Sequence, residues 1–316
     1  MRKAALIYNP TSGSKRQDRT RSIDSVAEVL RSAGVEAVRV PTTAPGSAGE
    51  QAREAIAGGC DTVFACGGDG TIHEVLQGVV GTDAALGVIP LGTANSLAFD
   101  LGIPRDPRRA AQAALVAEPR RIAAGKVEYC TASGSRSRYF TVAAGVGADA
   151  YLAYALSVDF KRTHGMPAYY AKAAQLWAVH DFPPFEVRFT DKATGERRVE
   201  RVSEMLAIRI TDFGGILRRM APRAALGRDD LELVLFKTRR RTSYLRFVIG
   251  NMFGRSPRVS DIESLGANEV ECVPVEGKAG KIHVEADGEV LGRVPARISV
   301  VPNAFRLLMR RVASTE

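Results

Sequence analysis

One aspartate stands among three glycines in the segment Gly67-Gly68-Asp69-Gly70-Thr71, between an apolar run at 61–65 and helical periodicity from residue 71. Glycine lets the backbone approach an anion closely, and the N–H groups at a helix start point toward that anion. Asp69 would repel a phosphate unless a metal ion or a substrate hydroxyl faces it. The pattern therefore favours phosphoryl transfer, although a tight turn in which Asp69 accepts backbone N–H groups is the alternative.

Strands and helices alternate through the first part of the chain. The hydrophobic pattern predicts strands at 4–8, 35–40, 61–65 and 85–89, and helices at 20–33, at 48–57, from 71 and after 93. Helical crossovers at this spacing predict a doubly wound α/β domain with a parallel sheet. Ligands bind beyond the carboxyl ends of such strands. We expect the loops at 9–13, 67–71 and 92–95 to converge there in one cleft.

The second part of the chain, from residue 126, is predicted to be an antiparallel sandwich or barrel. Its expected short strands are 127–130, 139–143, 185–190, 202–210, 231–237, 281–285 and 296–301. A helical insert at 148–179 is either a wall for an apolar substrate or a helix pair that covers one end. A linker at 120–125 is the best boundary, so we expect a nucleotide-binding domain at 1–125 and a β-sandwich lipid-substrate domain at 126–316.

Composition limits the classes of function. The chain has 316 residues, of which 45% are hydrophobic and 25% charged, with a net charge of +9. It has no apolar run of about 18 residues, so no spanning helix is expected. Its four cysteines lack zinc-site spacing, which favours a cytoplasmic protein with reduced thiols. The positive charge favours a phosphorylated ligand or an anionic membrane, with a solvated basic surface as the alternative. A nucleic-acid partner is not expected, because neither a recognition helix nor an aromatic platform is evident.

Five short motifs, in order along the chain, resemble the diacylglycerol kinase catalytic superfamily, which includes bacterial lipid kinases, sphingosine kinases and ceramide kinases. They are Asn9–Gly13, Gly67–Thr71, Gly92–Asn95 followed by Leu101–Pro104, Phe213–Gly215 with Ala221–Pro222, and Asp287–Glu289. The resemblance implies a nucleotide-binding α/β domain and a β-sandwich with the active cleft between them. It also implies ATP and Mg²⁺ as cofactors.

The resemblance assigns roles to individual residues. Asn9 and Asn95 would orient the loops, and Thr42 would be a further nucleotide contact. The residues that would hold the nucleotide phosphates are Gly67, Gly68, Asp69, Gly70 and Thr71, with Gly92 and Thr93 opposite.

The acceptor hydroxyl must lose a proton, and a carboxylate can accept it. By resemblance, Glu289 or Asp287 would be this base and Asp69 would lie at the metal–phosphate. The alternative for Asp287–Glu289 is a hairpin turn, since Asp-Gly is a strong turn signal. A structural Mg²⁺ site would use Leu226, Asp229 and Leu231, although Asp230 stands where the family usually has glycine.

Two departures bear on the substrate. Ser96 and Phe99 stand where bacterial diacylglycerol kinases usually have aspartate and arginine. A third, milder change is His73, which stands where asparagine is common. Either the acceptor is another lipid alcohol, or Lys15, Arg16 or another basic group rebuilds the charged network, or activity is weakened or lost.

The sequence thus predicts an ATP-dependent lipid kinase that transfers the γ-phosphoryl group to the hydroxyl of a diacylglycerol-like or sphingoid lipid. The alternatives are an NAD kinase-like phosphotransferase and a non-catalytic nucleotide- or lipid-binding homologue. The expected location is cytoplasmic, with peripheral association at an anionic membrane surface. Homodimer formation is left open.

Overall fold

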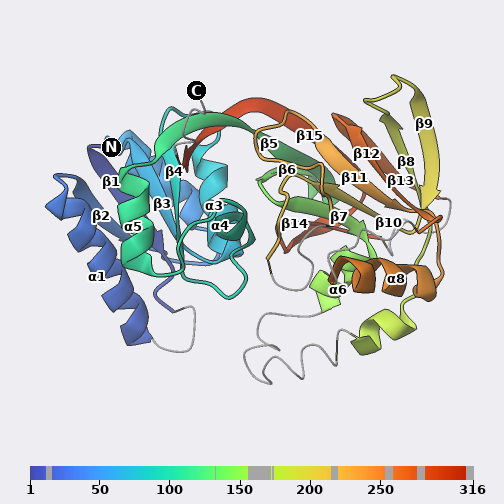
Figure 1. The fold of residues 1–316 in the computed structure, drawn as a ribbon, viewed down its shortest axis with the longest axis horizontal. Helices are drawn as coiled ribbons and strands as arrows, with labels where there is room; N and C mark the ends of the chain where they lie inside the picture. The colour runs from blue at the N-terminus through green and yellow to red at the C-terminus, as the bar shows by residue number, and fades with distance from the viewer. Residues whose placement is uncertain are drawn as a thin grey trace. The chain divides into compact units, whose positions relative to one another are not determined.

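The structure is a computed structural model that forms two compact units (Figure 1). It describes residues 1–11, 16–131, 133–155, 172, 174–214, 220–252, 259–275 and 282–310. The first unit contains residues 1–124, 213–214 and 302–310, and the second contains the described residues of 125–212 and 220–301.

The chain passes between the units inside two strands. Strand β5 (Glu118–Thr131) runs from the first unit into the second, and strand β15 (Glu289–Met309) returns to the first. The predicted boundary agrees with the division of the units after Ala124, but residues 120–125 are not a linker, because they belong to β5, which is paired with β15 and β6. The sequence analysis also did not include the return of the last strand to the first unit.

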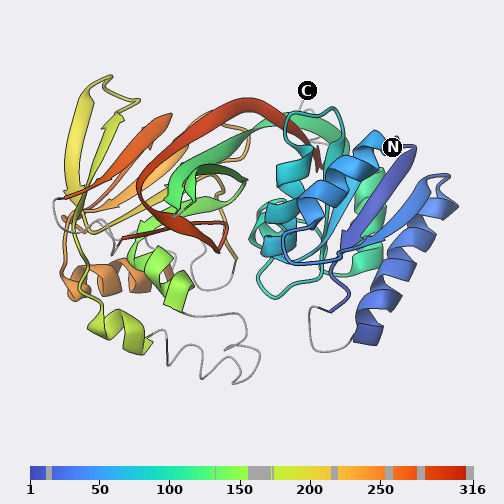
Figure 2. The ribbon, with the colours of Figure 1, turned by 180° about the vertical axis from the view of Figure 1, so that it is seen from behind.

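The first unit is a parallel sheet in the order β2-β1-β3-β4-β15. Its strands and helices are β1 (Lys3–Tyr8), α1 (Arg16–Ser32), β2 (Glu36–Pro41), α2 (Ala48–Ala57), β3 (Thr62–Gly67), α3 (Asp69–Val79), β4 (Ala85–Pro90), α4 (Ser96–Asp100) and α5 (Pro107–Leu115). Every residue of β3 and β4 is buried, as expected for central strands covered on both faces. Helices α1 and α5 pack together on one face (Figure 1), and α2 and α3 pack together on the other (Figure 2). The predicted doubly wound α/β architecture is confirmed.

Helices α2 and α3 approach each other through two glycines. A Cβ atom at Gly78 would overlap the carbonyl oxygen of Gly49, and one at Gly49 would lie 2.8 Å from the carbonyl oxygen of Glu74. Real Cβ contacts are not this short, so both positions require glycine. This close packing fixes the start of α2 against the second half of α3.

The second unit is an antiparallel β-sandwich with helices, as predicted. Its elements are β6 (Gly134–Phe140), β7 (Ala143–Gly147), α6 (Ala148–Ala155), β8 (Phe185–Thr190), β9 (Arg197–Val202), β10 (Glu204–Ile208), β11 (Leu231–Phe236), α8 (Arg241–Met252), β12 (Ile262–Ala267), β13 (Glu269–Pro274) and β14 (His283–Ala286). Strands β12-β11-β10-β7-β14-β15 are neighbours in this order, and β13, β8 and β9 extend from β15. Their inward side chains form one apolar core that includes Phe140, Phe185 and Leu233.

Some sequence expectations for this unit need correction. The expected strand at 139–143 is instead the end of β6 and the start of β7, separated by Thr141 and Val142. Strands β9, β12 and β13 were not predicted. Of the expected helical insert at 148–179, helix is found at 148–155, 172 and 174–179, and the other residues lie outside the described ones. No described helix has the length and apolarity needed to cross a bilayer.

Candidate active-site loops and acidic turn

The loops after β3 and β4 touch through their backbones. The strands end in register, with Gly67 opposite Pro90, and Leu91 N–H donates to Gly67 O at 2.9 Å. A Cβ atom at Gly92 would lie 2.5 Å from Gly68 Cα. A side chain at Gly92 would therefore force the two loops apart.

Asp69 ties these loops together. Its Oδ2 accepts from Asn95 N–H at 3.0 Å, and its Oδ1 accepts from Ser96 N–H at 2.7 Å. These N–H groups lie at the start of α4, where a helix has no internal acceptors for them. The turn alternative for Asp69, in which it satisfies backbone N–H groups, thus matches its geometry. A role of Asp69 at a metal–phosphate stays a prediction.

The start of α3 has the features of an anion site. Gly68 is its N-cap residue and has no side chain that could cap the helix. The first N–H groups of a helix point toward an anion that binds beyond its end. A Cβ atom at Gly67 would overlap the Thr71 side chain, which lies over this glycine. Thr71 thus fills the space that a side chain at position 67 would need, so this position requires glycine.

Two asparagines fold the loops on themselves. Asn95 adopts a left-handed backbone with φ of 56°, its Oδ1 accepts from Gly92 N–H at 3.0 Å, and its Nδ2 donates to Gly92 O at 2.8 Å. Asn9 Oδ1 accepts from Thr11 N–H at 2.8 Å. Residues 12–15 of the first predicted loop lie outside the described residues.

Thr42 follows β2 at the same edge of the sheet, where its N–H donates to Tyr8 O at 2.8 Å. Glu74 on α3 holds the loop after Thr42, because its carboxylate accepts from Gly46 N–H at 3.1 Å and from Ala48 N–H at 3.2 Å. The first unit therefore brings Thr42 and the two glycine loops to one edge of its sheet, beyond the carboxyl ends of the strands.

Asp287 and Glu289 lie in the second unit, at the turn between β14 and β15. Asp287 has a φ of +50°, so the hairpin-turn alternative also describes its backbone. Its Oδ1 accepts from Val142 N–H at 2.8 Å and from Ala143 N–H at 3.2 Å, and its Oδ2 accepts from Thr141 N–H at 3.0 Å. Both of its carboxylate oxygens are therefore engaged by backbone, whereas Glu289 is exposed.

Glu285 is a buried carboxyl group beside this turn that the sequence analysis missed. Its Oε2 accepts from Gly288 N–H at 2.8 Å. Burial, together with the nearby Asp149 carboxylate, raises the pKa of Glu285 well above its ordinary value. The available signal was the two-residue period of a strand, which places Glu285 and Asp287 on one face.

One of the predicted Mg²⁺ residues, Leu226, contacts a guanidinium group instead. Arg209 is fully buried, and its Nη2 donates to Leu226 O at 3.1 Å while its Nη1 donates to Asp230 O at 3.2 Å. Burial lowers the pKa of Arg209 to about 10, which leaves it charged at neutral pH. The Asp229 side chain is exposed. An internal cation therefore already contacts the Leu226 carbonyl oxygen, and we expect no Mg²⁺ at Leu226, Asp229 and Leu231.

The rest of the described residues also offer no cluster of metal ligands. Nowhere in the described part of the chain do three or more His, Cys, Asp or Glu side chains gather in a way that could hold a metal ion.

Phe99 packs against the Phe213–Gly214 segment. Gly214 has a φ of +71°, and a Cβ atom there would lie 3.0 Å from Phe99 Cγ. An aromatic contact thus stands where the resemblance led us to expect an arginine and its charged network. The side chains of Lys15 and Arg16, considered as replacements, lie outside the described residues.

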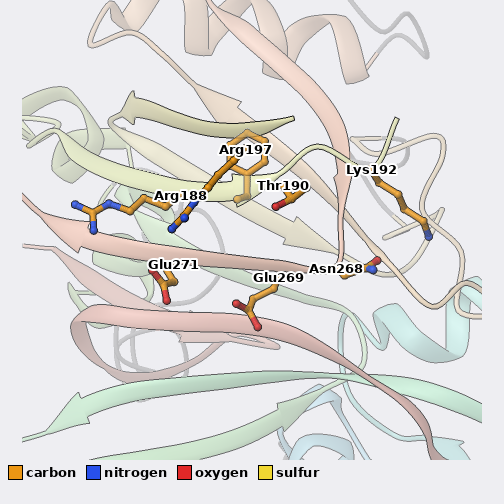
Figure 3. Close-up of a pocket in the computed structure, with 8 residues that line it drawn as sticks. Arg188, Thr190, Lys192, Arg197, Asn268, Glu269 and Glu271 are labelled. Atoms are coloured by element: carbon orange, nitrogen blue, oxygen red, sulfur yellow. The ribbon is translucent and has the colours of Figure 1, made fainter. Parts of the chain in front are cut away.

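A cavity of about 510 Å³ lies between β8, β9 and β13 in the second unit (Figure 3). Its charges are largely paired: Lys192 with Asp230 at 2.8 Å, Glu269 with Arg297 at 2.6 Å. None of the predicted site residues lines it.

Comparisons with known proteins agree with the motifs. The model of the diacylglycerol kinase catalytic domain matches residues 3–127, and that of the YegS C-terminal NAD kinase beta sandwich-like domain matches residues 141–309. A diacylglycerol kinase of Bacillus subtilis is 31% identical over 93% of this chain and 92% of its own length. One of Mycobacterium tuberculosis is 27% identical over 98% of this chain and 96% of its own length.

The fold is shared with a solved diacylglycerol kinase structure from Bacillus anthracis. It matches with a TM-score of 0.73 at 21% identity, over 97% of this chain and 96% of that one. The two domain models together cover most of the chain in the order that the motifs predict. The chain therefore belongs to the diacylglycerol kinase and YegS-like family of lipid phosphotransferases.

Proposed function

We propose that the chain transfers the γ-phosphoryl group of ATP to the hydroxyl of a diacylglycerol-like or sphingoid lipid. The observation that carries this proposal is the glycine-rich start of α3, which Asp69 joins to the loop after β4. Phosphoryl transfer needs positioning and charge stabilisation more than covalent help. The open N–H groups at a helix start supply both to a phosphate.

The nucleotide phosphates would bind to Gly67–Thr71, with Gly92 and Thr93 opposite. Mg²⁺ would arrive with ATP and neutralise part of the phosphate charge. Asp69 would keep the two loops at a fixed separation, and the glycines would let the backbone reach the phosphate oxygens.

Glu289 is our choice for the base that accepts the proton of the acceptor hydroxyl. Asp287 makes hydrogen bonds to Thr141, Val142 and Ala143 with both oxygens, so it is suited to holding the turn. Glu289 is exposed on that turn and is suited to receiving a proton. Peripheral association with an anionic membrane would bring the enzyme to its lipid acceptor.

Incubation of the purified protein with radiolabelled ATP, Mg²⁺ and separate micelles of dioleoylglycerol, ceramide or sphingosine tests the proposal. A labelled lipid supports it and identifies the acceptor class. A parallel reaction with NAD serves as the control, and labelled NADP without labelled lipid would show an NAD kinase instead. Binding of ATP by calorimetry, with no labelled product in any reaction, would show a non-catalytic homologue.

A further inference from the structure

Exposed apolar side chains gather on the helices of the second unit. Tyr154 on α6 is 57% exposed, Val179 is 67% exposed, and Leu245 and Ile249 on α8 are 50% and 43% exposed. Figures 1 and 2 both show α6, α8 and the helical residues 174–179 at one end of this unit. Large apolar side chains in such positions call for a partner when they are grouped.

Helix α8 has a packed face and an open face. On the packed face, the rings of Tyr244 and Phe247 lie 4.6 and 5.2 Å from the ring of Phe236 on β11. On the open face, Leu245 and Ile249 are four residues apart and therefore project on the same side of the helix. The sheet thus fixes α8 so that two apolar side chains face solvent.

Arginines surround these apolar side chains. Arg239 donates to Asp181 O at 2.7 Å and Arg241 donates to His180 O at 2.9 Å, which fastens the segment after residue 179 to the start of α8. Both acceptors are backbone carbonyls, so the positive charge is not neutralised. Within the described residues, no carboxylate forms an ion pair with Arg239, Arg240, Arg241 or Arg246.

We propose that α8 and residues 174–179 form a docking face for an anionic lipid bilayer. Arg240 and Arg246 would contact lipid phosphates, while Leu245, Ile249 and Val179 would enter the interface beneath the headgroups. The arginines on this helix surface match the anionic headgroups of a membrane, and the apolar side chains between them match the hydrocarbon beneath those headgroups. The inference deepens the proposed function by naming the surface that reaches the lipid, and its test requires no phosphoryl transfer.

Co-sedimentation of the full chain with vesicles, in the absence of ATP, tests the docking face. The vesicles are phosphatidylcholine with or without phosphatidylglycerol. We expect binding only to the anionic vesicles, weakened by salt. The R240Q/R246Q variant should bind about 25-fold more weakly, since each arginine near such a surface contributes about fivefold. The L245S/I249S variant should also bind more weakly.

Matched controls lie on strands of the same unit. Val199→Ser changes an apolar side chain that is 59% exposed on β9, and Arg138→Glu reverses an exposed charge on β6. Both should bind as the unsubstituted protein does. Equal binding by the α8 variants and the unsubstituted protein would overturn the proposal, as would equal binding to neutral and anionic vesicles. Kinase activity toward lipid in detergent micelles is measured separately, so a failure of the docking face is distinguishable from a failure of the proposed function.

Discussion

The carboxylate of Asp69 accepts the backbone N–H of Ser96 at 2.7 Å and so joins the start of α3 to the start of α4. These residues are 27 positions apart in the chain, and the hydrogen bond holds the two loops together. The carboxylate that seemed unsuited to a phosphate site from the sequence thus has a clear use, because it holds the loops that frame the site.

Asp69→Asn should weaken both folding and nucleotide binding. Asparagine keeps one acceptor oxygen and turns an N–H group toward a backbone donor, so one hydrogen bond is lost. We expect the free energy of unfolding to fall by about 1–3 kcal/mol. Urea denaturation measures this change, and calorimetry with ATP measures binding. Glu54→Gln, at an exposed position on α2, is the control and should change neither. Unaltered stability of the Asp69 variant would contradict the role given to this carboxylate.

Asp287→Asn and Glu289→Gln should separate anchoring from proton transfer. The amide that replaces the Asp287 carboxylate cannot accept from all three backbone N–H groups, so this variant should lose about 1–3 kcal/mol of stability along with its activity. Glu289 is exposed, and its replacement should abolish turnover while leaving the melting temperature and ATP binding unchanged. Melting curves and single-turnover assays on both variants provide the measurement. If instead only the Asp287 variant is inactive, Asp287 is the base.

Two carboxyl groups, the buried Glu204 and the paired Glu263, predict opposite pH dependences of the free energy of unfolding. Burial raises the pKa of Glu204 well above its ordinary value of 4.5, with a further contribution from Asp149. The folded state therefore binds the proton more tightly than the unfolded state, and stability falls as pH rises above 4.5. Between about pH 5 and pH 8, the free energy of unfolding of the Glu204→Gln variant should fall less than that of the unsubstituted protein. Urea denaturation at each pH measures this difference.

The pKa of Glu263 is shifted in the opposite direction, so its contribution to stability has the opposite pH dependence. The hydrogen bonds from Arg198, at 2.8 and 2.9 Å, lower its pKa to about 2. This contribution to stability is present above the ordinary pKa of 4.5 and is lost as pH falls toward 2. Glu263→Gln should therefore destabilise the protein at about pH 7 but have little effect near pH 2. Parallel stability curves for the variant and the unsubstituted protein would contradict the assignment.

Arg209 should make the fold independent of divalent cations at the turn of residues 226–230. EDTA is expected to leave the melting temperature of the nucleotide-free protein unchanged. Arg209→Met leaves the carbonyls of Leu226, Arg228 and Asp230 without their donor, at a cost of at least ~3 kcal/mol. Differential scanning calorimetry measures both. A lower melting temperature in EDTA would show that a metal ion does bind there.

The parts of the fold that follow local patterns were predictable. Helix α2 and strand β8 have the expected bounds, Ala48–Ala57 and Phe185–Thr190, because their apolar residues recur at a regular spacing. Strand β9 was missed because charged residues dominate its sequence and hide the period of a strand. Strand β5 was mistaken for a linker, since its pairing with β15 joins residues far apart in the chain.

In the candidate site, too, the features that follow local patterns were predictable and the contacts between distant residues were not. The glycines of the two loops were the sequence signal for the candidate site, and the close backbone contacts between the loops require them. The partners of Asp69 and the buried position of Glu285 depend on which strands are neighbours, and no local pattern reports that. Arg209 was overlooked for the same reason, since the carbonyls that it contacts begin 17 residues later.

The return of β15 also bears on how the chain is made. Arg306 and Leu307 pair with Ala85 and Leu86 on β4. A ribosome synthesises residues 1–301 before this part of β15, so until then the first unit has one sheet edge unpaired. An isolated fragment ending at residue 125 would keep that edge open to strands of other copies, which makes it prone to aggregate.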